Sequence, residues 1–236
     1  MKEQKNFIEN QIEGNHSIIP FKNILNEEDI RQIKSHSNVV NYLKNDVIFK
    51  QNTRTSHVMY ILSGLIKIYR ESRNNKTKII KLGIPGEFLG LNSIFGEETF
   101  SYSAAALEKS MVYIIDRDVF EKIILNNGQY SHELLKTITS EDLEIFKRLI
   151  SQSQKQLPGR IADIIIYFSE KIYDSHNFSF PLTRTELAEL AGTTKESLIR
   201  TLTEFKNDKI IELEGKKVNI KSYDIVKTLR DRKSVV

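Results

Sequence analysis

Two short helical patterns meet at a glycine between residues 183 and 202, and this arrangement constrains the fold more than any other part of the chain. Each pattern has an apolar face, made of Leu187, Leu190 and Ala191 in the first and of Leu198 and Leu202 in the second. Ala188 is small enough to let two helices cross closely. Gly192 lies in the turn, where a positive φ angle costs a glycine least. We therefore expect two helices packed at a steep angle.

Both helices carry a start signal of their own. Thr183-x-x-Glu186 and Thr193-x-x-Glu196 each fit the capping box, in which a threonine and a glutamate three residues later bond reciprocally to backbone amides. With the small residue and the glycine, these signals predict a helix-turn-helix, the motif that places its second helix in the major groove of DNA. The competing interpretation is an ordinary helical hairpin in a protein core.

Composition limits the class of protein without identifying it. The 236 residues suit two modest domains, and 39% hydrophobic with 28% charged residues is typical of a globular protein. A net charge of +4, from 35 basic and 31 acidic residues, is too small to indicate nucleic-acid binding by itself, so such binding must depend on local placement of charge. The absence of cysteine excludes disulfides, thiolate zinc sites and cysteine-bound iron–sulfur clusters.

The sequence predicts neither a metal centre, nor a catalytic centre, nor a membrane segment. No two histidines stand at a metal-ligand spacing such as HxxxH, and no Ser/His/Asp arrangement or cofactor fingerprint indicates an enzyme. The first residues, MKEQKNFIENQIEGN, contain no apolar signal region, and no run of 18 apolar residues occurs. We expect a cytoplasmic protein that is not an enzyme and binds neither metal nor membrane.

Residues 40–115 read as a series of short strands. Runs rich in β-branched and aromatic residues recur: VVNYL, DVIFK, VMYIL, LIKIYR, KIIKLGI, YSAAAL and VYIID. Turn signals separate them, among them Asn45-Asp46, Ser63-Gly64 and Pro85-Gly86. Such spacing predicts a compact antiparallel barrel or sandwich.

The rest of the chain reads mainly as helix. We expect a short helix over 118–125 and a long one over 130–156, which ends at Leu157-Pro158-Gly159 because neither proline nor glycine continues a helix cheaply. This break is the candidate hinge. Residues 209–220 predict a β-hairpin that turns at Glu214-Gly215. A helix-turn-helix followed by a hairpin is a winged helix.

Two adjoining apolar stripes run along the expected long helix. Both must be buried, which suits one face packed on the chain's own strands and the other on a second copy of the chain. The alternative is a helix buried wholly within a monomer, which the polar SQSQKQ end does not suit. The positions that we assign to a homodimer interface alternate at spacings of three and four: Leu135, Ile138, Asp142, Ile145 and Leu149.

In this order of parts, the chain resembles the Crp/Fnr family of bacterial transcription regulators. The resemblance starts near residue 18 and is carried by VIFKQNTRTSHVMYILSGLIKIY, PGEFLG, PGRIADIIIYF and the helix-turn-helix. It implies an α+β fold with an antiparallel β-roll like a cyclic-nucleotide-binding jelly roll (1–128), a long dimerisation helix and hinge (129–157), and a winged helix-turn-helix domain (158–236). The implied function is a sequence-specific regulator whose partners are double-stranded DNA at a pseudo-palindrome, a second copy of the chain and RNA polymerase.

Lys195, Glu196 and Arg200 match the base-reading positions of that family. An arginine at such a place forks onto O6 and N7 of a guanine, and a glutamate accepts a hydrogen bond from a cytosine amino group. Lys195 stands where cyclic-AMP receptor proteins have arginine, so either its base choice is looser or it contacts phosphate alone. The competing interpretation is a solvated charged helix face. We expect a half-site that contains GA.

Six further residues are expected to contact DNA phosphates through hydroxyl groups or positive charge. They are Thr183, Arg184, Thr194 and Ser197 in the motif and Lys216 and Lys217 in the hairpin. Backbone amides at the start of the second helix suit the same role. A charged hairpin tip is often no more than solvated surface, which is the alternative for the two lysines.

The resemblance places an effector pocket around Gly90, Leu91, Tyr102 and Ser103. Cyclic-nucleotide-binding members carry G-x-F-x-G-E, whose glutamate binds the ribose, and later R-S-A, whose arginine neutralises the cyclic phosphate. Leu91 stands at the glutamate position here, and Tyr102 at the arginine position. Because a buried phosphate without its cation is strongly destabilised, we expect no binding of cyclic AMP.

Other cofactors of the family do not suit the chain either. A cluster-binding sensor needs cysteine ligands, and a heme sensor needs an axial ligand, for which His57 is only an isolated candidate. We therefore expect no resident cofactor. Either an unidentified small ligand binds the altered pocket, or the dimer binds DNA without an effector and is controlled by its abundance. A different function for the same fold would be a ligand-sensing module whose output is a protein partner.

Cyclic AMP should leave the melting temperature of the purified protein unchanged, because a ligand that does not bind the native state cannot stabilise it. A thermal-shift titration with cyclic AMP checks this. A clear, saturable rise would show that the pocket holds the phosphate by other means.

Overall fold

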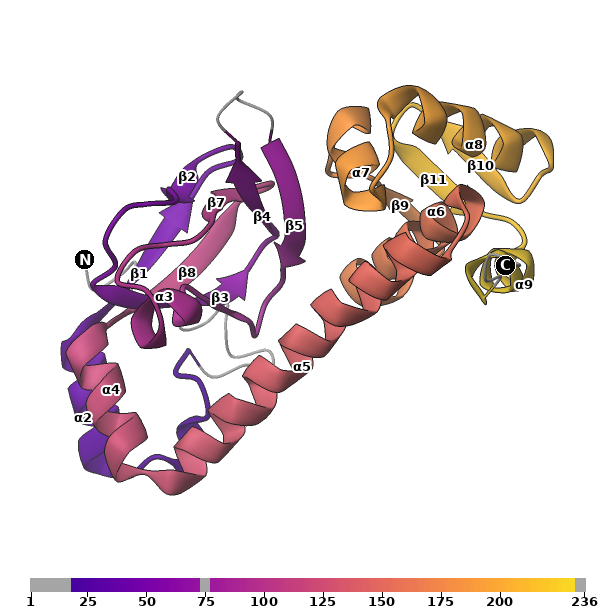
Figure 1. Ribbon diagram of the computed structural model, residues 1–236. Coiled ribbons are helices and arrows are strands. Elements are labelled where there is room, and N and C mark those ends of the chain that lie inside the picture. The colour runs from indigo at the N-terminus through magenta and orange to yellow at the C-terminus, as the bar shows by residue number, and fades with distance from the viewer. Residues whose placement is uncertain (1–17, 73–76, 232–236) are drawn as a thin grey trace. The chain divides into compact units, whose positions relative to one another are not determined.

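The computed structural model describes residues 18–72 and 77–231 (Figure 1). Two compact units divide the chain, one made of residues up to 70 with 82–141, the other of 71–81 with the residues from 142 onward. The division near residue 141 falls inside the long helix α5 (Gly128–Gln154). This helix therefore contributes its first half to one unit and its second half to the other.

Strands dominate the N-terminal part, where two four-stranded sheets lie in the orders β1-β8-β3-β6 and β2-β7-β4-β5. The strands are β1 (Ser37–Tyr42), β2 (Val47–Phe49), β3 (His57–Ser63), β4 (Ile66–Glu71), β5 (Thr77–Gly83), β6 (Phe88–Leu89), β7 (Ser103–Ala106) and β8 (Ser110–Asp116). The pairs of β8 with β1 and β3, and of β7 with β2 and β4, are antiparallel. The expected antiparallel β-roll is thus confirmed. Only the two-residue β6 lacked a strand pattern, because it is too short to show one.

Helices cover one end of this roll and share its core. They are η1 (Lys22–Ile24), α2 (Glu27–Ser35), α3 (Leu91–Phe95), α4 (Arg117–Asn126) and the first turns of α5. Tyr130 and Leu134 of α5 are buried in one apolar cluster with Phe120 of α4 and Ile115 of β8. The burial of apolar side chains in such a core is the main contribution to the stability of the domain. One face of the long helix therefore packs on the chain's own roll, as its apolar pattern predicts.

The C-terminal part is a winged helix. Its elements are α6 (Leu157–Ile166), the π-helix η2 (Tyr167–Ile172), β9 (Asn177–Ser179), α7 (Arg184–Ala191), α8 (Lys195–Asn207), β10 (Ile211–Glu214), β11 (Lys217–Ile220) and α9 (Tyr223–Asp231). Isoleucines of α6 fill the centre of this domain, with Ile161 and Ile165 almost completely buried. The hairpin β10–β11 matches the expected wing, and β9 adds a third strand beside β11.

Helices α7 and α8 pack as the sequence predicts. Leu187, Ala188, Leu198 and Leu202 are all buried between and beneath them. Gly192 ends α7 with a left-handed backbone, at φ 64°. At the start of α7, the Thr183 hydroxyl accepts from the Glu186 amide at 3.2 Å and the Glu186 carboxylate accepts from the Thr183 amide at 2.8 Å. The first capping box is therefore confirmed.

The second capping box, Thr193-x-x-Glu196, is wrong. The Thr193 amide bonds back to the Ala188 carbonyl at 2.9 Å, so Thr193 still belongs to the turn that ends α7. Thr194 caps α8 instead, and its hydroxyl accepts from the Ser197 amide at 3.2 Å. The shift of one residue leaves the Glu196 side chain free of the capping role.

The C-terminal end of α7 is held by two side chains from other helices. Arg160 of α6 donates from Nη1 to the carbonyls of Ala191 and Gly192, at 3.1 and 2.8 Å. Gln152 of α5 donates to the carbonyl of Leu190 at 3.3 Å. The last carbonyls of a helix have no partner within the helix, and a cation beside them also suits the helix dipole. Helices α5 and α6 thereby fix where α7 ends and α8 begins.

Replacing Gly192 by alanine should destabilise the protein more than the same change at Gly215. Both glycines have a left-handed backbone, which costs an alanine about 1–2 kcal/mol. A Cβ atom at Gly192 would also lie 3.1 Å from Gln152 and 3.3 Å from Arg160, whereas nothing lies within 4 Å of one at Gly215. Denaturant unfolding of the full chain measures both changes in stability, and equal changes would show that the close packing beneath Gly192 contributes nothing.

Candidate nucleic-acid interface

The three side chains expected to read bases lie together on the outer face of α8. Lys195, Glu196 and Arg200 are exposed, while the opposite face of the helix is buried through Leu198, Thr201, Leu202 and Phe205. Within the part of the chain that the structure describes, no hydrogen bond or ion pair engages these three side chains. One carboxylate and two cations are therefore available to a ligand on a rigid helix.

Hydroxyl groups flank this face at the starts of both helices. Thr194 donates its hydroxyl proton to Ser197 Oγ at 3.1 Å, which leaves the Ser197 proton free for an acceptor such as a phosphate oxygen. Thr183 donates its own to the Glu186 carboxylate at 2.9 Å. A phosphate contact by the Thr183 proton would thus cost an existing hydrogen bond, and Ser197 is the better donor of the two.

Arg184 joins α7 to the wing. Its Nη2 donates to the carbonyl of Gly215 in the β10–β11 turn, and its guanidinium lies 5.8 Å from the centre of the Phe180 ring. Burial lowers the pKa of this guanidinium, which still remains charged at neutral pH. On the other side of the turn, the Phe180 amide donates to the Lys216 carbonyl at 3.0 Å. The exposed side chains of Lys216 and Lys217 are thus presented from a turn fixed on both sides.

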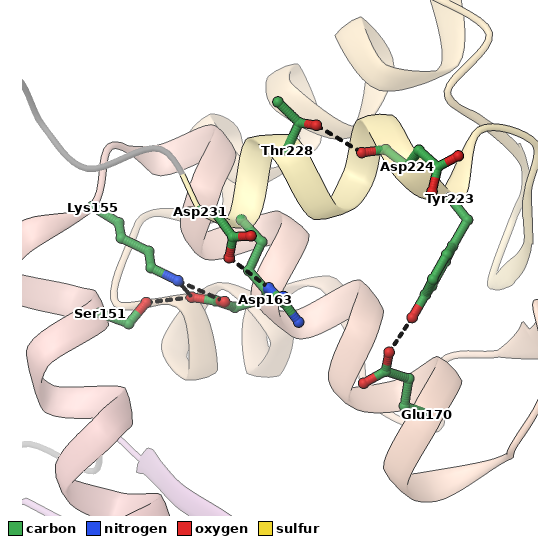
Figure 2. Close-up of polar contacts among 9 residues, drawn as sticks. Ser151, Lys155, Asp163, Glu170, Tyr223, Asp224, Thr228 and Asp231 are labelled. Carbon is green, nitrogen blue, oxygen red and sulfur yellow. Dashed lines mark hydrogen bonds and ion pairs between the residues drawn. The ribbon is translucent and has the colours of Figure 1, made fainter.

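A second polar cluster connects α5 with α6 (Figure 2). The Asp163 carboxylate accepts from Lys155 Nζ at 2.8 Å through each oxygen, and also from the Ser151 hydroxyl. These bonds cross the break between α5 and α6 at residues 155–156. The sequence predicts this hinge at Leu157-Pro158-Gly159, but these three residues form the first turn of α6, where proline is tolerated because the amide it lacks would have no partner in the helix. Together with Gln152 and Arg160, this cluster positions the motif, and sequence reasoning missed it. The available signal was a lone carboxylate in the otherwise apolar run IADIII.

Helix α9 closes the domain against α6, and its polar contacts also lie in Figure 2. The Tyr223 hydroxyl donates to the Glu170 carboxylate, and this hydrogen bond raises the pKa of Tyr223. The ring of His176 stacks on Tyr223 with a centroid distance of 4.6 Å. These contacts tie the last described helix to η2 and to the residue that precedes β9.

An exposed apolar stripe follows α5, but it is not quite the one assigned from the sequence. Leu135, Asp142 and Leu149 are exposed as expected, whereas Ile145 is half-buried and Ile138 packs against the core of the roll. The exposed apolar side chains on α5 are Leu135, Leu143, Phe146, Leu149 and Ile150. Positions spaced alternately by three and four repeat on average every 3.5 residues, whereas a helix has 3.6 residues per turn. Each stripe therefore rotates slowly around the helix, and residues of both stripes are exposed.

In the roll, two of the four expected pocket residues are in direct contact. The Gly90 amide donates to the Tyr102 hydroxyl at 2.9 Å, and Tyr102 packs at a centroid distance of 5.5 Å from Phe49. Leu91 and Ser103 are buried, and the Ser103 hydroxyl accepts from the Gln51 amide at 3.0 Å. The four residues bring a phenol, a hydroxyl and an aliphatic side chain to this place, but no cation.

Neither a metal site nor a membrane span is found among the described residues. No three of their histidines, aspartates and glutamates are grouped so that they could hold a metal ion. None of their helices combines the length and the apolarity that crossing a membrane requires.

Both parts of the chain match known families. Residues 39–127 match the cyclic nucleotide-binding domain, and residues 159–227 match the Crp-like helix-turn-helix domain. Among curated relatives, the anaerobic regulatory protein of Haemophilus influenzae is 26% identical over 210 residues, which is 86% of this chain and 79% of the relative. The CRP-like cAMP-activated global transcriptional regulator of Mycobacterium tuberculosis is 23% identical over 185 residues, or 77% of this chain and 83% of the relative.

Solved structures share the fold of this chain. FixK2 from Bradyrhizobium japonicum superposes with a TM-score of 0.75 at 17% identity, over 83% of this chain and 98% of that protein. A Crp/Fnr-family transcriptional regulator from Eubacterium rectale gives a TM-score of 0.77 at 16% identity, over 92% of this chain and 100% of that one. At such sequence identities the structures show the fold, and the two family matches say which two domains the chain contains. The chain belongs to the Crp/Fnr family of transcription regulators, whose members are not enzymes.

Proposed function

We propose that the protein is a homodimeric regulator that reads a pseudo-palindromic DNA site through α8. The observation that carries the proposal is the set of exposed, unpaired side chains Lys195, Glu196 and Arg200 on a helix capped at Thr194. Arg200 supplies the two parallel donors that guanine accepts, and Glu196 supplies an acceptor for a cytosine amino group. Ser197, Lys216 and Lys217 hold phosphates on either side. Partners of the bound dimer would include RNA polymerase in the cytoplasm.

The proposed dimer uses the exposed stripe of α5. The fold of the single chain leaves five large apolar side chains on one helix between 39% and 61% exposed, and their burial against a second copy would be favourable. A twofold axis along α5 would present two α8 helices to successive major grooves, roughly 34–36 Å apart. A ligand-sensing module with a protein partner has no specific observation in its favour, since it leaves the exposed face of α8 unexplained.

Control by cyclic AMP is not part of the proposal. A relative from M. tuberculosis is named for activation by cAMP, but this chain has Leu91 and Tyr102 where cyclic-nucleotide binders have glutamate and arginine. The Tyr102 hydroxyl is the acceptor of the Gly90 amide, so it is engaged in the roll itself. A neutral phenol does not replace a guanidinium beside a buried phosphate. We therefore propose either a different small effector or none.

Placing glutamates at Phe146 and Leu149 together should give monomers, because the substitutions bring four carboxylates into an interface that buries these positions twice. Light scattering on the purified protein measures the mass. The matched control is Leu125→Glu, at a leucine on α4 that is 83% exposed, which should leave the dimer intact. A dimer that persists in the double variant would show that the chains associate elsewhere.

Selection from a random duplex pool at fixed salt tests the DNA-reading role directly. The wild-type protein should enrich a palindrome with GA in each half-site. Arg200→Ala should relax the preference at one base per half-site, because each bidentate pair that the variant cannot form is worth about 1–3 kcal/mol of discrimination. An unchanged preference in the variant would refute the assignment of Arg200.

Lys216→Ala serves as the control for a phosphate contact. It should weaken binding to all sequences alike and lower the salt dependence by about one phosphate per protomer, with no change in base preference. A sequence-dependent reduction in affinity would mean that the wing reads bases.

A further inference from the structure

One apolar side chain interrupts the polar outer face of α8. Ile199 is 41% exposed, whereas the other exposed residues of this helix are Lys195, Glu196, Arg200, Thr203, Glu204, Lys206 and Asn207. The fold of the chain buries the other apolar residues of α8 on the opposite face and leaves Ile199 only partly covered. Single exposed isoleucines are common on protein surfaces. This one is notable for its position.

Ile199 lies among the three residues assigned to base reading. It follows Lys195 by four positions and Glu196 by three, spacings that put side chains next to each other on a helix. It also directly precedes Arg200. In a helix that lies in the major groove, a side chain at this place faces base edges together with its neighbours.

The major groove presents one apolar group, the C5 methyl of thymine. A β-branched side chain in a helix is restricted to essentially one χ1 rotamer, so Ile199 offers a rigid apolar surface that loses little freedom on binding. A cytosine or adenine at the same place would bring an amino group against a hydrocarbon, where it would lose its hydrogen bonds to water.

We propose that Ile199 is a specificity-determining residue that reads the methyl group of a thymine next to the bases read by Arg200 and Glu196. The proposal rests on the function proposed above and deepens it. Each half-site then contains a T·A pair whose recognition depends on a van der Waals contact rather than on a hydrogen bond. This contact is independent of charge, so salt should affect it little.

Replacing single thymines by deoxyuridine in the selected operator tests the proposal, because this change removes only the methyl group. For the wild-type protein, one thymine per half-site should be sensitive, with affinity falling about fourfold for each half-site altered, as expected for one buried methyl group. In Ile199→Ser, the same change should have no effect on affinity. Ile199→Val should keep most of the sensitivity.

Ile225→Ser is the matched control, since Ile225 of α9 is 47% exposed and lies outside the recognition helix. This variant should retain the full sensitivity to deoxyuridine substitution. Equal melting temperatures of the two serine variants would exclude a folding effect.

The outcomes separate the two proposals. If the wild-type protein enriches no palindrome, the proposed function fails, and the assignment of Ile199 fails with it. If a palindrome is enriched but no thymine is sensitive, or if the sensitivity persists in Ile199→Ser, the regulator stands and the assignment of Ile199 alone is overturned.

Discussion

The end of helix α7 is the constraint on which the DNA-reading surface depends. Its last carbonyls accept from Arg160 and Gln152, and Gly192 lets the backbone turn tightly enough for both side chains to reach them. The direction in which the chain leaves Gly192 sets the start of α8, and hence the direction of Lys195, Glu196 and Arg200. Without these partners, the carbonyls would be left unsatisfied in a half-buried place. The position of the recognition helix is therefore a consequence of capping from outside the motif.

Much of this architecture could be predicted from the sequence because its signals are local. The first capping box, Gly192 and the alternating apolar positions lie within 20 residues, and each reports on its own backbone. The strands of the roll were equally visible, since turn residues separate runs of β-branched side chains. Exposure of Lys195, Glu196 and Arg200 follows from the same helical period that buries Leu198 and Leu202.

The rest depended on contacts between residues far apart in sequence. The guanidinium of Arg184, which the sequence assigns to a DNA phosphate, also bonds to Gly215, 31 positions away, and no local pattern reveals this contact. The cap of α8 is a local exception: the Thr193 amide bonds to the Ala188 carbonyl five positions earlier, which extends the turn by one residue and makes Thr194 the cap. Ile138 is assigned to the interface stripe of α5 from the sequence, and the contact of this side chain with the core of the roll is not visible in the local pattern. At Arg184 and Ile138, by contrast, the contact is tertiary and lies outside the reach of a local pattern.

The bonds to Asp163 change what the break between α5 and α6 can do. Lys155 and Asp163 are 20% and 28% exposed in their side chains, so bending at the break between α5 and α6 would leave a half-buried carboxylate without its cation. The angle between α5 and α6 is therefore fixed, and the second half of α5 moves together with α7 and α8 as one rigid unit. In a dimer built along α5, a small change in how the two copies pack would alter the distance between the two recognition helices. Regulation of such a molecule would select among operators by the spacing of their half-sites, while the affinity for each half-site stayed the same.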